Sequence, residues 1–236
     1  MDKADFDRHA RNYTETLDSC IRVSGYASSD FAERKVREMH MYMKALGLAD
    51  GNLRVLDFGC GIGVSEPYLR CYFPGADIFA LDVSRESIEL ARERNRDLDR
   101  VTFSVFDGVH IPFPGPFDLI MIAGVLHHID SVMRINILSA IKDILSPEGK
   151  LFIFEHNPWN PVTRRIVHDC AFDENADLVS PLAAADLLKR SGFMMRTLRF
   201  IHFFPRLLDF LTPLERYLRK MPLGAQYYYI AGKRNS

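Results

Sequence analysis

Residues 53–63 read LRVLDFGCGIG, an apolar run that passes at once into a glycine-rich turn. The apolar side chains of 53–58 are typical of a strand that is buried on both faces, as in a parallel sheet. Gly59, Gly61 and Gly63 then follow at every second position. Glycine allows a turn with positive φ and lets a ligand approach the backbone closely. This stretch therefore predicts a ligand-binding turn at the edge of an α/β sheet.

The spacing of these glycines disfavours two common ligands. A dinucleotide site needs G-x-G-x-x-G, and the third glycine would have to stand at Val64 or Glu66. A phosphate-binding P-loop needs G-K-[ST], which is absent here. NAD, FAD and nucleoside triphosphates are therefore poor candidates.

Strand and helix signals alternate along the chain. Strands are expected at 53–58, 77–81, 101–106, 117–122, 150–155, 193–204 and 226–233. Helices are expected at 3–19, 30–46, 63–71, 84–94, 132–145, 180–189 and 206–220. Strict alternation in the middle of the chain predicts an α/β fold with a doubly wound parallel sheet and right-handed crossovers.

The segment Asp57–Gly63 has the form D-x-G-x-G-x-G and resembles the first motif of class I S-adenosylmethionine-dependent methyltransferases. The resemblance implies a Rossmann-like, mostly parallel seven-stranded sheet whose last strand inserts antiparallel beside the sixth. It also implies S-adenosyl-L-methionine as cofactor and S-adenosyl-L-homocysteine as product. We expect an N-terminal helical lid over 1–48 and the methyltransferase domain over 49–236.

Two acidic residues follow strands at the positions that the resemblance assigns to the nucleoside. Asp82 follows the second strand, where a carboxylate can accept hydrogen bonds from ribose hydroxyls. Asp107, followed by Gly108, comes after the third strand and would receive the adenine amino group. Val83 and Phe106 could pack against the adenine ring. The plainer alternatives are a helix N-cap region for Asp82 and an Asp-Gly turn for Asp107.

The remaining cofactor contacts lie at other strand ends and on the lid. Asp57 would orient the methionine amine, and Tyr13 would lie over the cofactor on a lid that is hinged at Ser24 and Gly25. The alternatives are a buried Asp57 bonded to loop amides and a Tyr13 packed as a core residue. The other predicted cofactor contacts are Gly59, Cys60, Gly61, Gly63 and Ala123.

Three histidines follow the fourth and fifth strands, at the expected mouth of the site. His127, His128 and His156 are candidates for a catalytic base, because imidazole titrates near neutral pH and a hydroxyl or ring N–H acceptor must lose a proton. Alternatively one of them packs into the helix interface, or the reaction proceeds by positioning alone.

The segment EHNPWNP at 155–161 suggests a rigid loop over the methyl acceptor. Asn157 would bind the substrate and Trp159 would form a wall of its pocket, together with Phe172 and Tyr227–Tyr229. The alternative is an ordinary proline-rich turn with a packed Trp159.

Residues 203–229 are rich in aromatic and apolar side chains. A coiled-coil-like stripe runs through Leu207, Leu211, Leu214, Leu218 and Met221. Packing on the sheet is the favoured interpretation. A dimer seam, part of the acceptor pocket or a lipid-binding surface are the alternatives.

Composition excludes several classes of protein. The 236 residues carry a formal net charge of −1, which disfavours nucleic acid as a partner. The four cysteines show no metal-binding spacing and are expected to be free thiols in a reducing compartment. The N-terminus lacks a secretory signal, and no apolar run is long enough for stable membrane insertion. We expect a soluble, cytoplasmic monomer or homodimer without a metal.

These features predict an S-adenosylmethionine-dependent methyltransferase that modifies an oxygen or nitrogen atom of a small molecule, such as a secondary metabolite. Methylation of a glycan or lipid precursor is one alternative. A non-catalytic S-adenosylmethionine-binding module that partners another protein is a second. An aminopropyl transferase is disfavoured, because the loop after the fourth strand offers only Asp130 where a polyamine site would need several acids.

Overall fold

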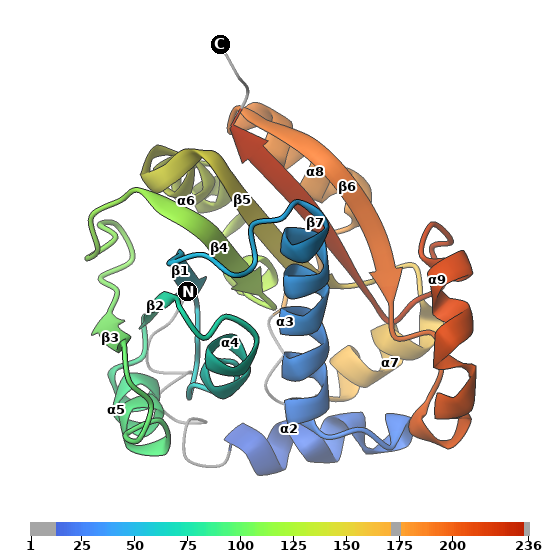
Figure 1. Ribbon diagram of the computed structural model, residues 1–236. Helices are drawn as coiled ribbons and strands as arrows, with labels where there is room; N and C mark the ends of the chain where they lie inside the picture. Colours follow the sequence, from blue (N-terminus) through green and yellow to red (C-terminus); the bar gives the residue numbers. More distant parts are fainter. Residues whose placement is uncertain (1–12, 171–175, 234–236) are drawn as a thin grey trace.

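The computed structural model describes residues 13–170 and 176–233, which form one seven-stranded sheet with helices on both faces (Figure 1). The strand order is β3-β2-β1-β4-β5-β7-β6. The strands are β1 (Arg54–Phe58), β2 (Asp77–Asp82), β3 (Val101–Val105), β4 (Phe117–Ala123), β5 (Leu145–His156), β6 (Phe193–Ile201) and β7 (Gln226–Lys233). The predicted fold is confirmed, since β7 inserts antiparallel between β5 and β6 while β1 to β5 pair in parallel.

The helices flank this sheet in two layers. They are α2 (Tyr13–Ile21), α3 (Ser28–Ala45), α4 (Glu66–Tyr72), α5 (Arg85–Arg94), α6 (Ser131–Ile144), α7 (Pro161–Asp169), α8 (Pro181–Arg190) and α9 (Glu215–Leu218), with short 3-10 helices η2 (Arg22–Ser24), η3 (Leu126–His128) and η5 (Arg206–Leu214). No helix of the described residues is both long and apolar enough to cross a bilayer.

Alternating side chains of the central strands pack into two apolar cores, one on each face of the sheet. On β1, Val55 packs into the core under α3 and α4, whereas Leu56 packs into the core under α6 and α8. On β4 the same alternation separates Met121 from Ile120. Because successive strand side chains point to opposite faces, a strand that is apolar at every position must be covered on both sides. This burial fixes the register of the strands whose ends build the site.

Several helix boundaries follow from their caps. The Ser84 side chain accepts a hydrogen bond from the Ser87 amide and begins α5, as predicted. The start of α3 differs from the prediction: Asp30 is the third residue of the helix, and its carboxylate accepts from the Ala27 amide. The helix therefore begins two residues earlier, at Ser28.

Two segments after β5 depart from the predicted elements. Helix α7 has no counterpart among the expected elements, although Asn160 caps it through the Val162 and Thr163 amides and Pro161 stands at its first position. The expected helix at 206–220 is instead the 3-10 helix η5 followed by the single turn α9, because Pro213 interrupts it.

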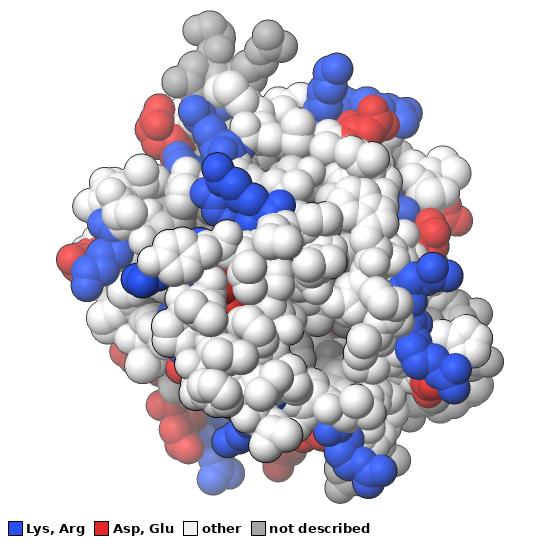
Figure 2. All heavy atoms as spheres, turned by 90° about the vertical axis from the view of Figure 1, so that its right-hand side faces the viewer, with Lys and Arg blue, Asp and Glu red and all other residues white. Residues whose placement is uncertain are grey.

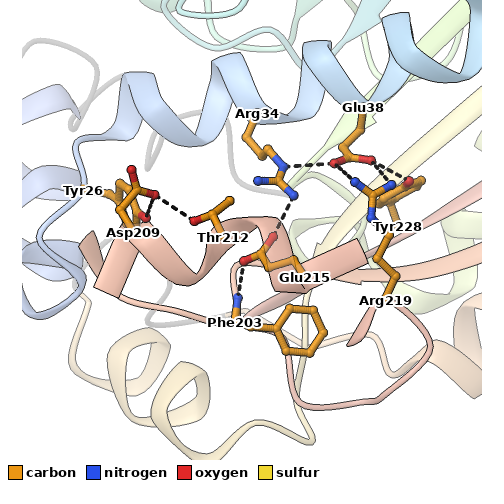
Figure 3. Close-up of polar contacts among 9 residues, drawn as sticks. All are labelled: Tyr26, Arg34, Glu38, Phe203, Asp209, Thr212, Glu215, Arg219 and Tyr228. Atoms are coloured by element: carbon orange, nitrogen blue, oxygen red, sulfur yellow. Dashed lines mark hydrogen bonds and ion pairs between the residues drawn. The ribbon is translucent and has the colours of Figure 1, made fainter. Parts of the chain in front are cut away.

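The connection between β6 and β7, residues 202–225, forms a roof segment held against α3 by buried charges (Figure 3). Arg34 on α3 donates to Glu215 at 2.7 Å and to its own neighbour Glu38 at 3.0 Å. The second oxygen of Glu38 accepts from Arg219, and it also accepts from the Tyr228 hydroxyl on β7 at 3.0 Å. A buried network in which each charge has a partner fixes the relative position of the elements it joins.

The roof segment also exposes part of the predicted apolar stripe, so the expectation that the stripe packs on the sheet is wrong. Leu207 is 88% exposed, and Leu214 and Met221 are about half exposed. Figure 2 shows this side of the molecule as a broad uncharged surface flanked by Lys and Arg side chains. The 3-10 geometry of η5 explains the error, since it does not keep a heptad stripe on one face.

The cysteine prediction is partly wrong as well. Cys20 near the end of α2 and Cys170 just after α7 form a disulfide, with their Cα atoms 5.4 Å apart, while Cys60 and Cys71 are free thiols. A separation of 150 residues gives no sequence signal for this pairing. The bond ties the N-terminal helices to the main fold. Because two of the four cysteines are paired, the cysteines no longer support the expectation of a reducing compartment.

Candidate active site

Two adjoining cavities lie at the edge where the parallel strands end. Cavity A, of about 310 Å³, lies beyond the ends of β1, β2 and β4. Cavity B, of about 410 Å³, lies under α2, α3 and the roof segment. Both are lined by the loops after β1 and β4, through Gly59, Gly61, Ala123, Gly124 and His128. Ligands of open α/β sheets bind at this edge, so the two cavities are the candidate site.

The glycine-rich turn separates into a ligand-facing part and a packing part. Gly61 has φ +54°, lines both cavities, and a Cβ placed on it would meet no atom within 4 Å. Gly59 has φ +83°, and a Cβ there would lie 2.4 Å from Val125. Gly63 faces away from the cavities toward Asn95, so the structure does not support its predicted cofactor contact. The turn leaves an open cradle at Gly61 that suits a bulky ligand.

Asp82 lies at the end of β2 and lines cavity A, as the ribose assignment requires. One carboxylate oxygen accepts from the Gly61 amide and the other from the Ser84 amide, both at 2.9 Å. Each oxygen of an ionised carboxylate can accept a further hydrogen bond. Asp82 therefore both braces the glycine turn and lines the cavity.

Asp107 and Gly108 line the far wall of cavity A. The Asp107 carboxylate accepts from the His110 and Val109 amides, each at 2.7 Å. These backbone hydrogen bonds, together with the His110 ring, lower the pKa of Asp107 to about 2. The group is therefore a permanent anion, as a partner for an amino group should be.

Apolar side chains form the rest of cavity A. Val83 and Phe106 both line it, and Phe106 packs edge-on against Phe58 with ring centroids 5.3 Å apart. Buried aromatic and branched walls of this kind fit a flat heteroaromatic ring. Val83 and Phe106 thus lie where the predicted adenine contacts require.

Asp57, the last residue but one of β1, lines cavity B close to a second buried acid. Burial raises the pKa of Asp57 to about 7, Lys35 opposes this rise, and Asp82 adds to it. Glu66, at the start of α4, is fully buried with neither carboxyl oxygen hydrogen-bonded in the described part of the chain. Burial, then the nearby Asp57, raises the pKa of Glu66 well above its ordinary value. A cation in cavity B would favour the ionised form of Asp57.

The three predicted histidines meet where the cavities join. The ring of His127 lies 4.2 Å from that of His128 and 5.2 Å from that of His156, between centroids. All three line cavity B, and His128 also lines cavity A. The sequence prediction that they gather at the mouth agrees with this placement.

Glu155, which the sequence analysis missed, orients the cluster. Its side chain is fully buried at the end of β5, accepting from the Leu126 amide at 2.8 Å and contacting His127 Nδ1 at 2.5 Å. Burial alone would raise the pKa of Glu155, but His127, His156 and the Leu126 amide together outweigh burial and lower it. An ionised Glu155 keeps the proton of His127 on Nδ1, which leaves Nε2 as the basic nitrogen. Glu155 directly precedes the predicted His156 in the sequence, and this adjacency was the signal that could have identified it.

One face of α3 forms a wall of cavity B, which the sequence analysis also missed. Ser28, Phe31, Ala32 and Lys35 line the cavity at positions i, i+3, i+4 and i+7. Helix α2 contributes Leu17 and Ile21 beside them. This spacing is the amphipathic signal of a helix, but it does not tell whether the face meets a core or a cavity.

Some predicted acceptor contacts do not reach the cavities. Asn157 is fully buried and lines neither of them, because its amide nitrogen donates to the Pro222 and Gly224 carbonyls of the roof segment. Trp159 is 45% exposed, and its ring packs near that of Phe200 with centroids 6.5 Å apart. Asn157 therefore holds the roof segment, whereas Trp159 packs beside β6, and both lie outside the two cavities.

The predicted aromatic wall is likewise placed elsewhere. Tyr227 and Tyr229 are buried and donate to the Val179 and Pro181 carbonyls, and neither lines a cavity. Phe172 lies outside the described residues. The backbone of Tyr13 begins α2, but its side chain is outside the described part, so its lid role stays a prediction. Cys60 does line cavity B, where burial raises its pKa well above the ordinary value.

Comparison with known proteins identifies the central part of the chain. Residues 55–149 match the family described as "Methyltransferase domain". Human thiol S-methyltransferase TMT1B is 29% identical over 129 residues, covering 52% of this chain and 51% of that protein. Demethylmenaquinone methyltransferase of Tropheryma whipplei is 29% identical over 113 residues, covering 48% and 45%. The chain spans about half the length of these curated relatives.

Solved structures share the whole fold at low sequence identity. A SAM-dependent methyltransferase from Archaeoglobus fulgidus superposes with a TM-score of 0.66 at 18% identity, covering 88% of this chain and 95% of that one. Magnesium protoporphyrin IX methyltransferase of Synechocystis, with bound SAH, gives 0.62 at 15% identity, covering 92% and 87%. Residues 55–149 therefore match a methyltransferase domain, and the described residues share the fold of these solved methyltransferases, which confirms the resemblance.

Proposed function

We propose that the chain with this domain catalyses transfer of a methyl group to a small molecule, at an oxygen or nitrogen atom, such as in a secondary metabolite. The observation that supports this proposal most is the pair of adjoining cavities. The predicted cofactor-binding residues line cavity A, and a histidine cluster lies at the junction with cavity B. A thiol acceptor enters as a further candidate because a relative is named a thiol S-methyltransferase.

The residues of cavity A fit the nucleoside end of S-adenosylmethionine. Gly61 leaves open space for the ligand, and Asp82 offers acceptor oxygens for two ribose hydroxyls. The permanently ionised Asp107 would receive the adenine amino group. Asp57, which lines cavity B, would bind the methionine ammonium. When bound, the cofactor supplies an electrophilic methyl group for an in-line displacement.

The chain's own part in the reaction is to position the acceptor, exclude water and accept a proton. His127, held by Glu155, presents Nε2 as the base for a hydroxyl acceptor. His128 and His156 flank that ring and would orient the acceptor. The α2 and α3 helices and the roof segment line cavity B and would exclude water around a bound acceptor, which makes positioning effective.

A cavity of about 410 Å³ encloses a small molecule or the head group of a larger one. A glycan or lipid precursor is therefore the main alternative acceptor. A non-catalytic S-adenosylmethionine-binding module is the alternative from another class. It would leave the histidine cluster and cavity B without a chemical role.

Calorimetric titration with S-adenosylmethionine and S-adenosylhomocysteine tests the proposal first. Micromolar binding of both is expected, and screening of acceptors by homocysteine release should follow. Single exchanges of His127, His128 and His156 for Asn should then separate a base from a scaffold, because a base loses turnover while cofactor affinity stays. Absence of binding would remove the basis for the proposed activity.

A further inference from the structure

Cavity B contains one feature that neither the cofactor nor the histidine cluster uses. Of the described residues lining the two cavities, Lys35 is the only lysine or arginine. It occupies the α3 face that lines cavity B, and the neighbouring face carries Arg34 and Glu38, which are bonded into the roof network (Figure 3). Lys35 itself makes no hydrogen bond or ion pair with another described residue. A half-buried ammonium without a partner is costly unless a ligand supplies one.

His202 faces the same cavity from the end of β6. Its Nε2 is buried and has no hydrogen-bond partner among the described residues. The backbone of His202 has φ +60°, a left-handed conformation that is uncommon for a residue other than glycine. Strained residues of this kind persist where the surroundings hold a side chain in place, often at functional sites.

Charged groups around cavity B act on both Lys35 and His202. Burial lowers the pKa of Lys35, while Glu155 and Asp57 oppose that change. Burial also lowers the pKa of His202 well below its ordinary value, with further contributions from Arg34, Lys35 and Arg37. His202 is therefore a neutral ring that can donate from Nε2 to an anion. Of the two acids near Lys35, Glu155 is already bonded to His127 and the Leu126 amide.

Aromatic side chains pack around His202 on the same side of cavity B. The ring of Phe31 lies 4.3 Å from that of His202, and Tyr26 packs edge-on against both. Phe203 lines the same wall, and its amide is fixed by Glu215 at 2.9 Å. Flat apolar walls with one cation and one N–H donor suit a planar molecule that carries a single negative oxygen or sulfur atom.

We propose that Lys35 and His202 form an anion subsite in cavity B that binds the methyl acceptor as a phenolate or aryl thiolate. This inference deepens the proposed function and rests on it. The main rival ligand for Lys35 is the carboxylate at the methionine end of the cofactor. It is also an anionic oxygen ligand, but it belongs to the cofactor and not to the acceptor.

The test uses 4-nitrophenol as probe, at a pH where it is ionised, with nitrobenzene as its neutral isostere. Binding to the full chain is followed by absorbance and calorimetry, with and without saturating S-adenosylhomocysteine. The wild type should bind the phenolate more tightly than nitrobenzene. Lys35→Met should weaken phenolate binding about 10- to 100-fold, because a charge-assisted bond is lost, and should leave nitrobenzene binding unchanged. Lys35→Arg should retain most of the phenolate affinity.

Two further variants control the result. Lys44→Met removes an exposed lysine from the same helix and should change nothing. His202→Asn keeps a residue type that tolerates positive φ, and should weaken phenolate binding about 3- to 10-fold. Thermal unfolding of each variant establishes that the fold is intact.

The proposal is overturned if wild type does not prefer the phenolate, or if Lys35→Met binds it as well as wild type. It is also overturned if Lys35→Met loses affinity for S-adenosylhomocysteine as strongly as for the phenolate, since the lysine would then serve the cofactor. Failure of wild type to bind S-adenosylhomocysteine would refute the proposed function. In that case the phenolate measurements without cofactor still decide whether Lys35 and His202 form an anion subsite.

Discussion

Replacing Asp82 by alanine tests the cofactor assignment most directly. The carboxylate accepts hydrogen bonds from the Gly61 and Ser84 amides, both at 2.9 Å, and lines cavity A. A hydrogen bond to a charged group contributes about 1.5–3 kcal/mol. Since each 1.4 kcal/mol is about tenfold in affinity, the dissociation constant for S-adenosylhomocysteine should rise about 10- to 150-fold.

Isothermal titration calorimetry with S-adenosylhomocysteine measures this loss. Asp82→Asn, which keeps one acceptor oxygen, should fall between wild type and Asp82→Ala. Glu89→Ala removes an exposed acid from α5, the helix that follows β2, and is the matched control. An unchanged dissociation constant in a folded Asp82→Ala protein would show that the ribose is bound elsewhere, because no loss of charge-assisted bonds would then have occurred.

Three other changes test separate parts of the molecule. Glu155→Gln removes the carboxylate that holds His127, so the unfolding free energy should fall by about 1–3 kcal/mol in urea titration, and an unchanged value would refute this pairing. Cys170→Ser removes the disulfide with Cys20, 150 residues away, so the unfolding free energy should fall by about 2–4 kcal/mol in non-reducing buffer. Dithiothreitol should lower the unfolding free energy of the wild type but not that of the variant. Asp57 has a raised pKa of about 7, so the folded state holds a proton that the unfolded chain has released, and stability should fall as pH rises from about 4 to 7. Asp57→Asn should flatten that slope in denaturant titrations at pH 5 and pH 8, and a slope equal to that of wild type would contradict the assignment.

The central sheet could be predicted because each of its strands is decided by local sequence. Val55 and Leu56 must both be covered, so the strand has to lie inside a sheet with helices on both faces. The turn after that strand has glycines at every second position, and the residues at the ends of its neighbours follow from strand order alone. Asp82 and Ala123 were therefore found from sequence, and both line the cavities.

The acceptor side could not be predicted because distant segments assemble it. Lys35 shares its helix with Arg34, and periodicity does not tell which of the two faces a cavity and which faces a buried acid. His202 follows a strand, but no local pattern marks its positive φ. The roof segment was assigned to a regular helix, since its apolar spacing fitted one, although Pro213 interrupts it.

The two cavities also differ in what known proteins can say about them. Every residue that lines cavity A falls within 55–149, the stretch that matches the methyltransferase domain. Most residues that line cavity B fall outside that stretch, on α2, α3, α7 and the roof segment. The family match over 55–149 therefore supports the cofactor half of the site and says little about the acceptor half. The identity of the acceptor has to be argued from groups such as Lys35 and His202, which is why a binding probe, and not a relative's substrate, is the first ligand to test.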